Sequence, residues 1–498
     1  MTEFDLPFKP AAEHARLLHT QAISPVELLN LYLDRIEKFN PALNAFLAMN
    51  IDAAITKAKE MESCIASGEA VGPLYGIPFG VKDNEVTKGI ETTHGSAWMK
   101  GHIPKEDSVV VERIKSAGGI IIGKTNMPDW GLMIHSENRL GDHTRNPWDT
   151  SRTSGGSSAG SASAVAAGLC SIASGTDGGG SIRAPSSFCG MFGIRPTLGR
   201  VPRYSGASDN YITNPISQPG PIARTVEDAA ILLEILAGFD LRDPDSVRAA
   251  VPSYPTMLAT DLSQLKIAYS PDYGYADVNK EVHDSVETAV NNLDSLGCKV
   301  EQVELDFSDA FYGYWPLISA NWYASLDKKF AKRTSDLAPE AFNVYQYGSK
   351  ITGKDYALAL GVRDQIISRL DTLFTKYDLL LSPTVPNTAF VAGRPKSGVK
   401  SDLESELWGF PAHSPFTFPI NAAGLPGANI PCGFDKDGLP IGLQVIGRRF
   451  EELRILQLSY GFEQAYPWPT VPPLFCLLYT SDAADDTPCV DLGGRRII

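Results

Sequence analysis

Apolar and polar positions along the chain follow two periods, one typical of helices and the other of buried strands. After Ser24, a Ser-Pro-Val-Glu sequence is typical of a helix start, and an apolar pattern of helical period follows it. Further helices are expected at residues 51–67, 106–117, 225–236 and 278–296. Short apolar runs predict strands at residues 75–81, 119–124, 266–270, 299–307 and 378–382. This alternation predicts an α/β fold with helices on both faces of a sheet.

A run rich in glycine and serine, residues 154–190, interrupts this pattern without resembling a flexible linker. A linker buries nothing and has no reason to place apolar residues regularly. Here apolar residues recur near helical spacing from Ala159 to Leu169, and residues 171–174 are typical of a short buried strand. The glycines therefore indicate backbone that adopts unusual dihedral angles, or approaches a ligand closely, inside a core.

Length and composition narrow the classes of function. The chain has 498 residues and no internal repeat or proline-rich linker, so we expect one domain over residues 1–475. A net charge of −14 argues against general binding of nucleic acid or anionic membranes. No apolar run could span a bilayer, no secretory signal is evident, and the seven scattered cysteines are typical of reduced thiols. We therefore expect a cytoplasmic protein with a small-molecule partner.

The last 23 residues, 476–498, show neither helical nor strand periodicity. They begin with CLLYTSDAADD, which resembles the translation of a sequencing-library adapter. We expect this segment to be a non-native tail, with a natural acidic tail as the alternative.

Residues 156–160 fit the G-x-S-x-G pattern of a nucleophile elbow, which would make Ser158 a nucleophile. An elbow needs a strand directly before the serine, whereas the preceding TSRTSG is polar. It also needs a downstream histidine base, and neither His283 nor His413 stands in a suitable segment. A phosphate-binding loop has still weaker support, because no Gly-Lys-Ser/Thr closes the run. Ser158 is therefore set aside.

Five stretches, in the expected order, resemble the amidase signature family. They are GIPFGVKDN, GGSSAGSASAVAAG, SGTDGGGSIRAPSSFCGMFGIRPT, LLLSPTVP and GLPGANIPCGFDKDGLPIGLQVIG. The resemblance extends from Ser24 to Trp468 and implies the amidase-signature fold, a large mixed twisted β-sheet covered by helices on both faces. It divides the domain into a helical N-terminal part (about 1–70), a signature core (about 71–240) and a specificity insertion (about 305–375).

The resemblance also implies a Ser-Ser-Lys triad of Lys82, Ser157 and Ser181. Ser181 is the expected nucleophile, and Ser157, which in the family follows a cis peptide bond, relays its proton to Lys82. A lysine acts as a base only when it is neutral, and burial favours the neutral form by lowering the pKa. Lys82 follows an apolar strand, where such burial is expected.

Further site residues are expected around this triad. Backbone N–H groups of Gly178, Gly179, Gly180 and Ser181 are expected to form an oxyanion hole. Asp177 and Arg183 flank this loop and are expected to pair and hold its shape. For the aromatic and apolar residues nearby, pocket lining and ordinary helix core both remain open. The candidates for the substrate pocket are Trp130, Met133, Tyr211, Tyr314 and Trp315. No metal or organic cofactor is required.

These residues predict a serine hydrolase that cleaves amides, and also carbamates (urethanes), carrying apolar or aryl groups, through an acyl-enzyme on Ser181. The chain looks like bacterial amidases, aryl acylamidases and urethanases. The expected partner is a small-molecule amide or carbamate, with no nucleic acid and no membrane, and a homodimer is left open.

The alternative is the transamidating A subunit of a glutamyl-tRNA(Gln) amidotransferase complex, which uses the same triad. The segment after IRPTLGRV lacks the Leu-Asp-Gln-Ile-Gly-Pro-like stretch of that protein, and this difference favours the hydrolase. A complete triad argues against a noncatalytic binding scaffold.

Overall fold

The computed structural model describes residues 6–67, 72–206, 214–394, 396–400, 410–473 and 475. In this part of the chain, eleven strands form one sheet in the order β1-β3-β2-β4-β6-β5-β10-β11-β9-β7-β8. The strands are β1 Phe46–Met49, β2 Pro78–Lys82, β3 Ile120–Thr125, β4 Ile172–Asp177, β5 Phe192–Arg195, β6 Gln218–Ala223, β7 Lys266–Tyr269, β8 Lys299–Gln302, β9 Leu379–Pro383, β10 Gly427–Phe434 and β11 Pro440–Gly447. Strand β2 is parallel to β3 and β4, whereas β4 and β6 are antiparallel, so the sheet is mixed as expected.

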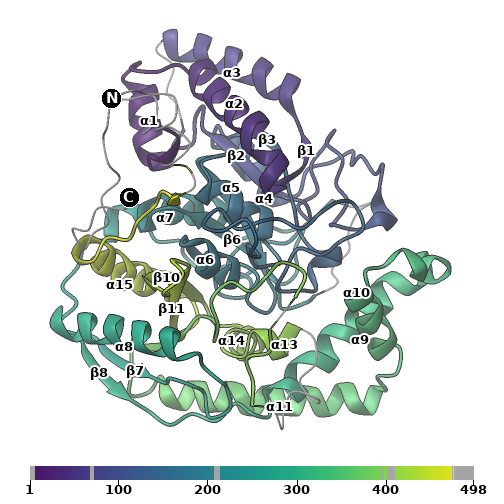
Figure 1. Ribbon diagram of the computed structural model, residues 1–498, viewed down its shortest axis with the longest axis vertical. Helices are drawn as coiled ribbons and strands as arrows, with labels where there is room; N and C mark the ends of the chain where they lie inside the picture. Colours follow the sequence, from purple (N-terminus) through teal and green to yellow (C-terminus); the bar gives the residue numbers. More distant parts are fainter. Residues whose placement is uncertain are drawn as a thin grey trace.

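Helices cover both faces of this sheet and extend beyond it (Figure 1). They are α1 Ala11–His19, α2 Pro25–Leu43, α3 Ile51–Ala66, α4 Val109–Ser116, α5 Ala159–Ala166, α6 Arg183–Cys189, α7 Val226–Leu236, α8 Lys280–Ser295, α9 Ala310–Phe330, α10 Pro339–Gly348, α11 Gly353–Leu373, α13 Phe410–His413, α14 Phe418–Ala423 and α15 Glu452–Ala465. Helices α4, α7, α8 and α15 share one apolar core with the strands, and α5 and α6 contribute to another. The α/β fold class is thereby confirmed.

Local sequence signals explain several boundaries. The side chain of Ser24 accepts a hydrogen bond from the Glu27 N–H and the Glu27 carboxylate accepts one from the Ser24 N–H, so α2 begins at the expected capping box. Helix α4 begins later than expected because the Ser108 side chain caps it. The strand expected over residues 299–307 ends at Gln302, because β8 lies at the edge of the sheet and is mostly solvent-exposed.

The glycine- and serine-rich run forms the centre of the molecule. Helix α5 and strand β4 are buried along their whole length. A Cβ atom at Gly160 would lie 2.2 Å from the Ala45 carbonyl oxygen and 2.2 Å from the Asn126 nitrogen, so only glycine permits this backbone contact. The small residues of the run thus allow α5 to pack directly against neighbouring backbone.

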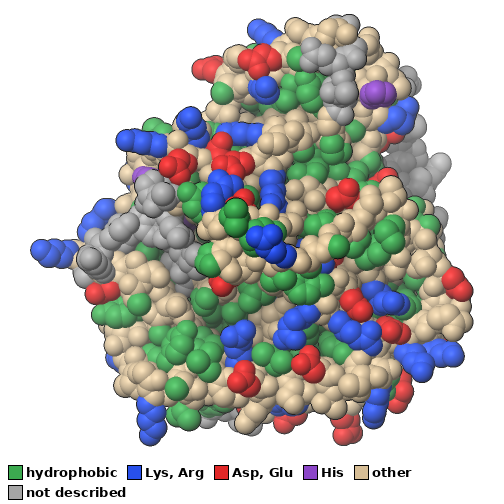
Figure 2. Space-filling model, turned by 180° about the vertical axis from the view of Figure 1, so that it is seen from behind, with side chains coloured by type: hydrophobic (Ala, Val, Ile, Leu, Met, Phe, Trp, Pro, Cys, Tyr) green, Lys and Arg blue, Asp and Glu red, His purple; other side chains and the backbone are tan. Residues whose placement is uncertain are grey.

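The expected specificity insertion forms helices α9, α10 and α11; α10 and α11 each pack against α9, and the three helices lie to one side of the sheet (Figure 1). The face seen in Figure 2 carries Lys, Arg, Asp and Glu side chains interspersed, without one large basic patch. None of the described helices is both long and apolar enough for a bilayer crossing. The expected tail, residues 476–498, lies outside the described residues, and the single-domain boundaries remain a prediction.

Candidate active site

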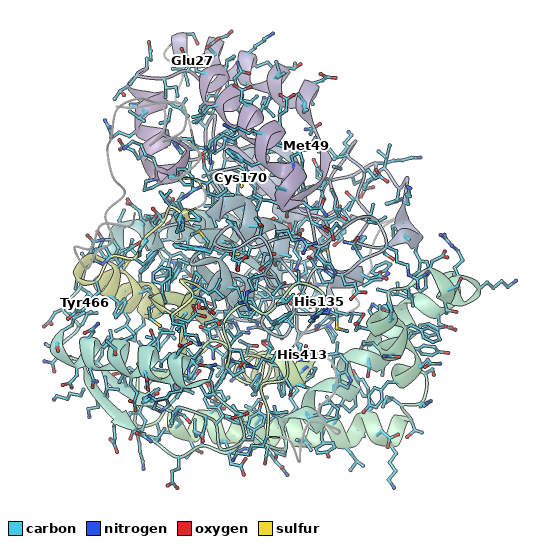
Figure 3. All side chains as sticks on the ribbon, in the orientation of Figure 1. Glu27, Met49, His135, Cys170, His413 and Tyr466 are labelled. Carbon is cyan, nitrogen blue, oxygen red and sulfur yellow. The ribbon has the colours of Figure 1, made fainter. Side chains whose placement is uncertain are left out.

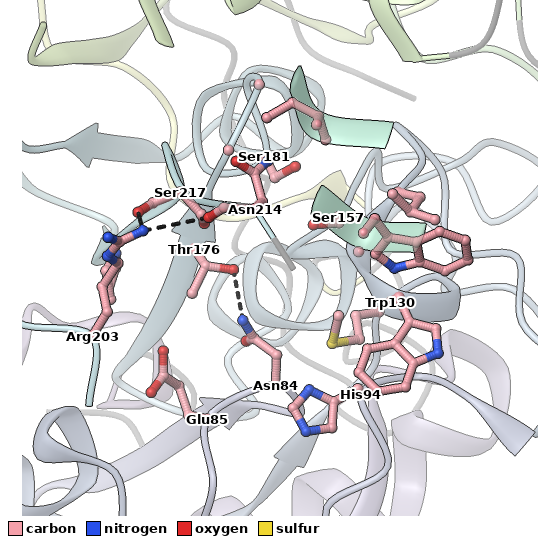
Figure 4. Close-up of a pocket in the computed structure, with 18 of the residues that line it drawn as sticks. Asn84, Glu85, His94, Trp130, Ser157, Thr176, Ser181, Arg203, Asn214 and Ser217 are labelled. Atoms are coloured by element: carbon pink, nitrogen blue, oxygen red, sulfur yellow. Dashed lines mark hydrogen bonds between the residues drawn. The ribbon is translucent and has the colours of Figure 1, made fainter. Parts of the chain in front are cut away.

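A pocket lies where β2 and β4 end, and helix α9 forms part of its wall (Figure 4). Ser157 and Ser181 both line it, and both side chains are almost fully buried. Lys82, the last residue of β2, lies directly behind Ser157. The structure therefore brings together the three residues of the expected triad, and the Gly156–Ser157 peptide bond is cis.

The Lys82 ammonium group is enclosed by oxygen atoms. Its Nζ lies 2.7 Å from Ser157 Oγ, 2.9 Å from Thr176 Oγ1 and 3.2 Å from the Thr176 carbonyl oxygen. The side chain is fully buried, and this burial lowers the pKa of Lys82 to about 7, although the negative charges of Asp177 and Glu85 oppose the shift. A substantial share of Lys82 is therefore neutral near pH 7.

A neutral lysine has two N–H donors and one lone pair, so one of its three oxygen neighbours must donate to it. The Thr176 carbonyl oxygen can only accept, whereas the Thr176 and Ser157 hydroxyls can each donate, at 2.9 Å and 2.7 Å from Nζ. The nearer hydroxyl, Ser157, is the one best placed to donate its proton to Nζ. The geometry thus suits proton transfer from Ser157 to Lys82.

The loop before Ser181 is held by side chains from distant elements. The Tyr314 hydroxyl donates to the Gly178 carbonyl at 3.0 Å, and the Thr417 hydroxyl donates to the Gly179 carbonyl at 2.5 Å. Because a peptide unit is planar, fixing the Gly178 carbonyl also fixes the direction of the Gly179 N–H. Gly180 has a φ of 129°, and a Cβ atom there would lie 2.2 Å from Thr417 Oγ1. Glycine is therefore required at this position.

One expected oxyanion donor is already engaged within the loop. The Gly180 N–H donates to Asp177 Oδ1 at 2.7 Å, so it is committed to the carboxylate rather than free for a substrate oxygen. Gly178, Gly179 and Ser181 line the pocket, and their N–H groups remain the candidates for an oxyanion hole.

Asp177 and Arg183 form a fully buried ion pair beneath the loop. Arg183 Nε lies 2.9 Å from Asp177 Oδ2, Arg183 Nη2 lies 3.0 Å from Oδ1, and neither side chain is exposed. Burial alone would raise the pKa of Asp177, but the charge and hydrogen bonds of Arg183, with help from Arg195 and Asn421, hold it well below its usual range. The carboxylate is thus ionised and organises the turn.

The candidate pocket residues divide into three groups. Trp130, Tyr314 and Trp315 line the pocket, and the Trp130 ring stacks on His94 with centroids 4.9 Å apart. Met133 is buried in the same apolar cluster as these three residues but does not line the pocket, so the expectation for this residue is wrong. Trp130 has a φ of 53°, so the backbone between Trp130 and Met133 begins with an irregular turn that sequence spacing does not show. Tyr211 lies outside the described residues.

Ser158, the central serine of the G-x-S-x-G pattern, does not face the pocket. It stands at the start of α5, is fully buried, and its Oγ lies 3.4 Å from the Thr176 carbonyl oxygen. Several polar residues that line the pocket were missed by sequence reasoning, and most of them come from segments without a motif. They are Asn84, Glu85, Thr176, Arg203, Asn214 and Ser217. Thr176 and Asn84 could have been found, because they flank Asp177 and Lys82 in the motifs.

The family model described as Amidase matches residues 27–456. The chain belongs to the amidase family. The A subunit of glutamyl-tRNA(Gln) amidotransferase from Acaryochloris marina is 36% identical over 488 residues, which cover 93% of this chain and 98% of that protein. A solved bacterial aryl acylamidase of the amidase signature family has a TM-score of 0.87 and 30% identity, covering 94% of this chain and 98% of its own. The solved A subunit of the Thermotoga maritima glutamyl-tRNA(Gln) amidotransferase has a TM-score of 0.77 and 30% identity. The match covers 95% of this chain and 99% of that chain.

These comparisons confirm the resemblance to the amidase family and its fold, and correct the expected function. The curated relatives are amidotransferase A subunits, so the expectation of a hydrolase for small aryl amides or carbamates is wrong, and the alternative is the better supported. The partner expectation is wrong for the same reason, because those relatives are named as one subunit of an enzyme for a transfer RNA. The segment after IRPTLGRV differs from the stretch expected of an A subunit, but this difference is local. The similarity over the whole chain outweighs it.

Proposed function

We propose that this chain is the amide-cleaving A subunit of a glutamyl-tRNA(Gln) amidotransferase. The observation that carries this proposal is the 36% identity to such a protein over almost the full length of both chains. The family match over residues 27–456 includes the signature core and helix α9, which forms part of the pocket wall. The proposed partners are further protein subunits and a charged transfer RNA.

The pocket residues suit the release of ammonia from a carboxamide donor such as glutamine. Ser181 Oγ attacks the carboxamide carbon, and its proton passes through Ser157 to neutral Lys82. Loop N–H groups stabilise the negative charge on the carboxamide oxygen. The C–N bond then breaks, the nitrogen takes back the proton and leaves as ammonia, and water hydrolyses the Ser181 ester to the carboxylic acid. The ammonia supplies the nitrogen that the assembled enzyme transfers to the glutamyl group.

The net charge of the chain is compatible with a complex in which different subunits bind the RNA and release ammonia. A net charge of −14 disfavours extensive contacts with phosphates. We therefore assign the RNA contacts chiefly to partner subunits, and ammonia release to this chain. A cytoplasmic location, where transfer RNA is charged, belongs to the same proposal, and the five cysteines of the described part are free thiols.

The experiment is reconstitution with the other subunits of such an amidotransferase. The complex should convert glutamyl-tRNA(Gln) to glutaminyl-tRNA(Gln) with ATP and glutamine. With Ser181→Ala, it should lose the glutamine-dependent reaction but keep activity with ammonium chloride, because only ammonia release needs Ser181. Failure of the chain to assemble with these subunits, or full glutamine-dependent activity of Ser181→Ala, would refute the proposal.

A further inference from the structure

A second cluster of chemically active side chains lies outside the residues that line the pocket. His135 and Glu137 belong to the segment after the short 3-10 helix η3 Asp129–Gly131, and Glu340 lies in the first turn of α10. One ring nitrogen of His135 and one carboxylate oxygen from each glutamate all lie within 4.8 Å of one another. His135 is buried, and Figure 3 places its label on the side of the molecule where α9 and α10 lie.

Three buried polar atoms in this cluster and beside it lack a hydrogen-bond partner among the described residues. They are His135 Nε2, Glu340 Oε2 and His143 Nδ1. The His135 side chain is only 1% exposed, so water does not reach it freely. The ring of His143 has its centroid 6.1 Å from that of His135, and His143 also acts electrostatically on Glu340. Buried polar groups are normally paired, and a bound ion is one arrangement that would pair several of them at once.

We propose that His135, Glu137 and Glu340 bind a divalent transition-metal ion, for which Zn²⁺ is the best match, with His143 or a water molecule as the fourth ligand. One imidazole and two carboxylates form a ligand set that suits Zn²⁺. The two carboxylates also balance the charge of the ion. This proposal concerns a different site from the proposed amide-cleaving pocket and does not depend on its function.

The spacing of the ligand atoms is compatible with this ion after a small adjustment. Tetrahedral Zn²⁺ with bonds near 2.0 to 2.2 Å places its ligand atoms about 3.3 to 3.6 Å apart. The cluster, within 4.8 Å, must therefore contract by about 1 Å. Glu137 and Glu340 are only partly buried, so their side chains have room to turn toward the ion.

The site would join two parts of the molecule that support the pocket. On one side, the backbone next to His135 lies behind Ser157, because a Cβ atom at Gly156 would lie 2.7 Å from the carbonyl oxygens of both Met133 and His135. On the other side, α10 packs on α9, which carries Tyr314 and Trp315. A hydrogen bond of 2.9 Å from the Ala338 N–H to Asp129 Oδ2 already connects these parts. The proposed metal ion therefore stabilises the packing of these two parts and has no catalytic role.

The test measures Zn²⁺ binding to the purified full chain after treatment with a chelator, by isothermal titration calorimetry. We expect one Zn²⁺ ion per chain and a higher midpoint of thermal unfolding in its presence. His135→Ala and Glu340→Gln should each weaken Zn²⁺ binding at least tenfold and remove the thermal shift. His283→Gln is the matched control, because His283 also lies near two carboxylates, 3.6 Å from Asp284 and from Glu287, but on the exposed surface of α8.

Three outcomes would overturn the proposal: no stoichiometric Zn²⁺ binding, unchanged binding by His135→Ala and Glu340→Gln, or equal loss of binding in His283→Gln. Because His135 is buried, its variant could fail to fold. The double variant Glu137→Gln/Glu340→Gln, at partly exposed positions, then decides the question by the same titration. Substitution of Co²⁺ for Zn²⁺ gives a second readout, since its visible spectrum reports tetrahedral coordination and should disappear in that double variant.

Discussion

Lys82 Nζ lies 2.7 Å from Ser157 Oγ, and the lysine side chain is fully buried. This short contact connects a lysine with a pKa lowered to about 7 to a hydroxyl that faces the same pocket as Ser181. A buried lysine is costly for the fold, because its charged form loses hydration. The arrangement therefore favours reactivity over stability at this position.

The first prediction is that Lys82→Met removes activity without weakening the fold. Loss of the general base should slow glutamine-dependent transamidation by the reconstituted complex about 10²- to 10⁴-fold. Because the folded-state pKa lies below that of an unfolded lysine, the buried group destabilises the fold most at low pH. Lys82→Met should thus resist urea at pH 6 at least as well as wild type. Lys82→Arg should be inactive as well, since arginine stays protonated; an active Lys82→Arg variant would exclude Lys82 as the base.

The second prediction concerns the dependence of the rate on pH. Only neutral Lys82 accepts a proton, so kcat/KM for glutamine should rise with pH through about 7 and then level off. Burial lowers this pKa, whereas the charge of Glu85 raises it. Glu85→Gln should therefore move the rising part of the profile to lower pH. Glu287→Gln, on the exposed surface of α8, should leave it unchanged. A shift of the Glu85→Gln profile to higher pH would contradict the assignment.

The third prediction tests how α9 supports the loop before Ser181. Tyr314→Phe removes the hydroxyl that orients the Gly178–Gly179 peptide unit. One hydrogen bond contributes about 1 kcal/mol, so kcat should fall about fivefold to tenfold while KM changes little. Tyr312→Phe removes a hydroxyl from the same helix at a side chain that is 47% exposed, and should keep wild-type kcat. Equal kcat values for the two variants would show that Tyr314 does not position the loop.

Local sequence signals were sufficient to predict much of the fold. The cap at Ser24 placed the start of α2, and the apolar strand before Lys82 indicated that this lysine is buried. The motif residues Asp177 and Arg183 could be paired because only a few residues separate them. In each case the deciding interaction is local, or the motif specifies it.

Contacts between distant segments could not be predicted in this way. Tyr314 and Gly178 are 136 positions apart, and no period or motif connects them. The same holds for His135 and Glu340, which only the packing of α10 brings together. The error in the expected function has a related cause, since one short segment was weighed against a similarity that extends over the whole chain.

The last prediction concerns the buried pair beneath the glycine loop. Asp177→Asn leaves the Arg183 guanidinium buried without its counter-charge, and also removes the negative charge 3.9 Å from Arg195. Breaking a buried ion pair by removing one partner typically costs about 3–5 kcal/mol, so the free energy of unfolding in urea should fall by about this amount. Activity should fall too, because asparagine keeps only one acceptor oxygen, so either the Gly180 N–H or the Ile182 N–H of the turn loses its acceptor. The control is Asp284→Asn, whose partner Lys280 is 85% exposed, and which should change the free energy of unfolding by less than about 1 kcal/mol. If both variants lose similarly little free energy of unfolding, the ion pair does not organise the loop. A large loss confined to Asp177→Asn would show that the buried carboxylate stabilises the loop that carries Ser181.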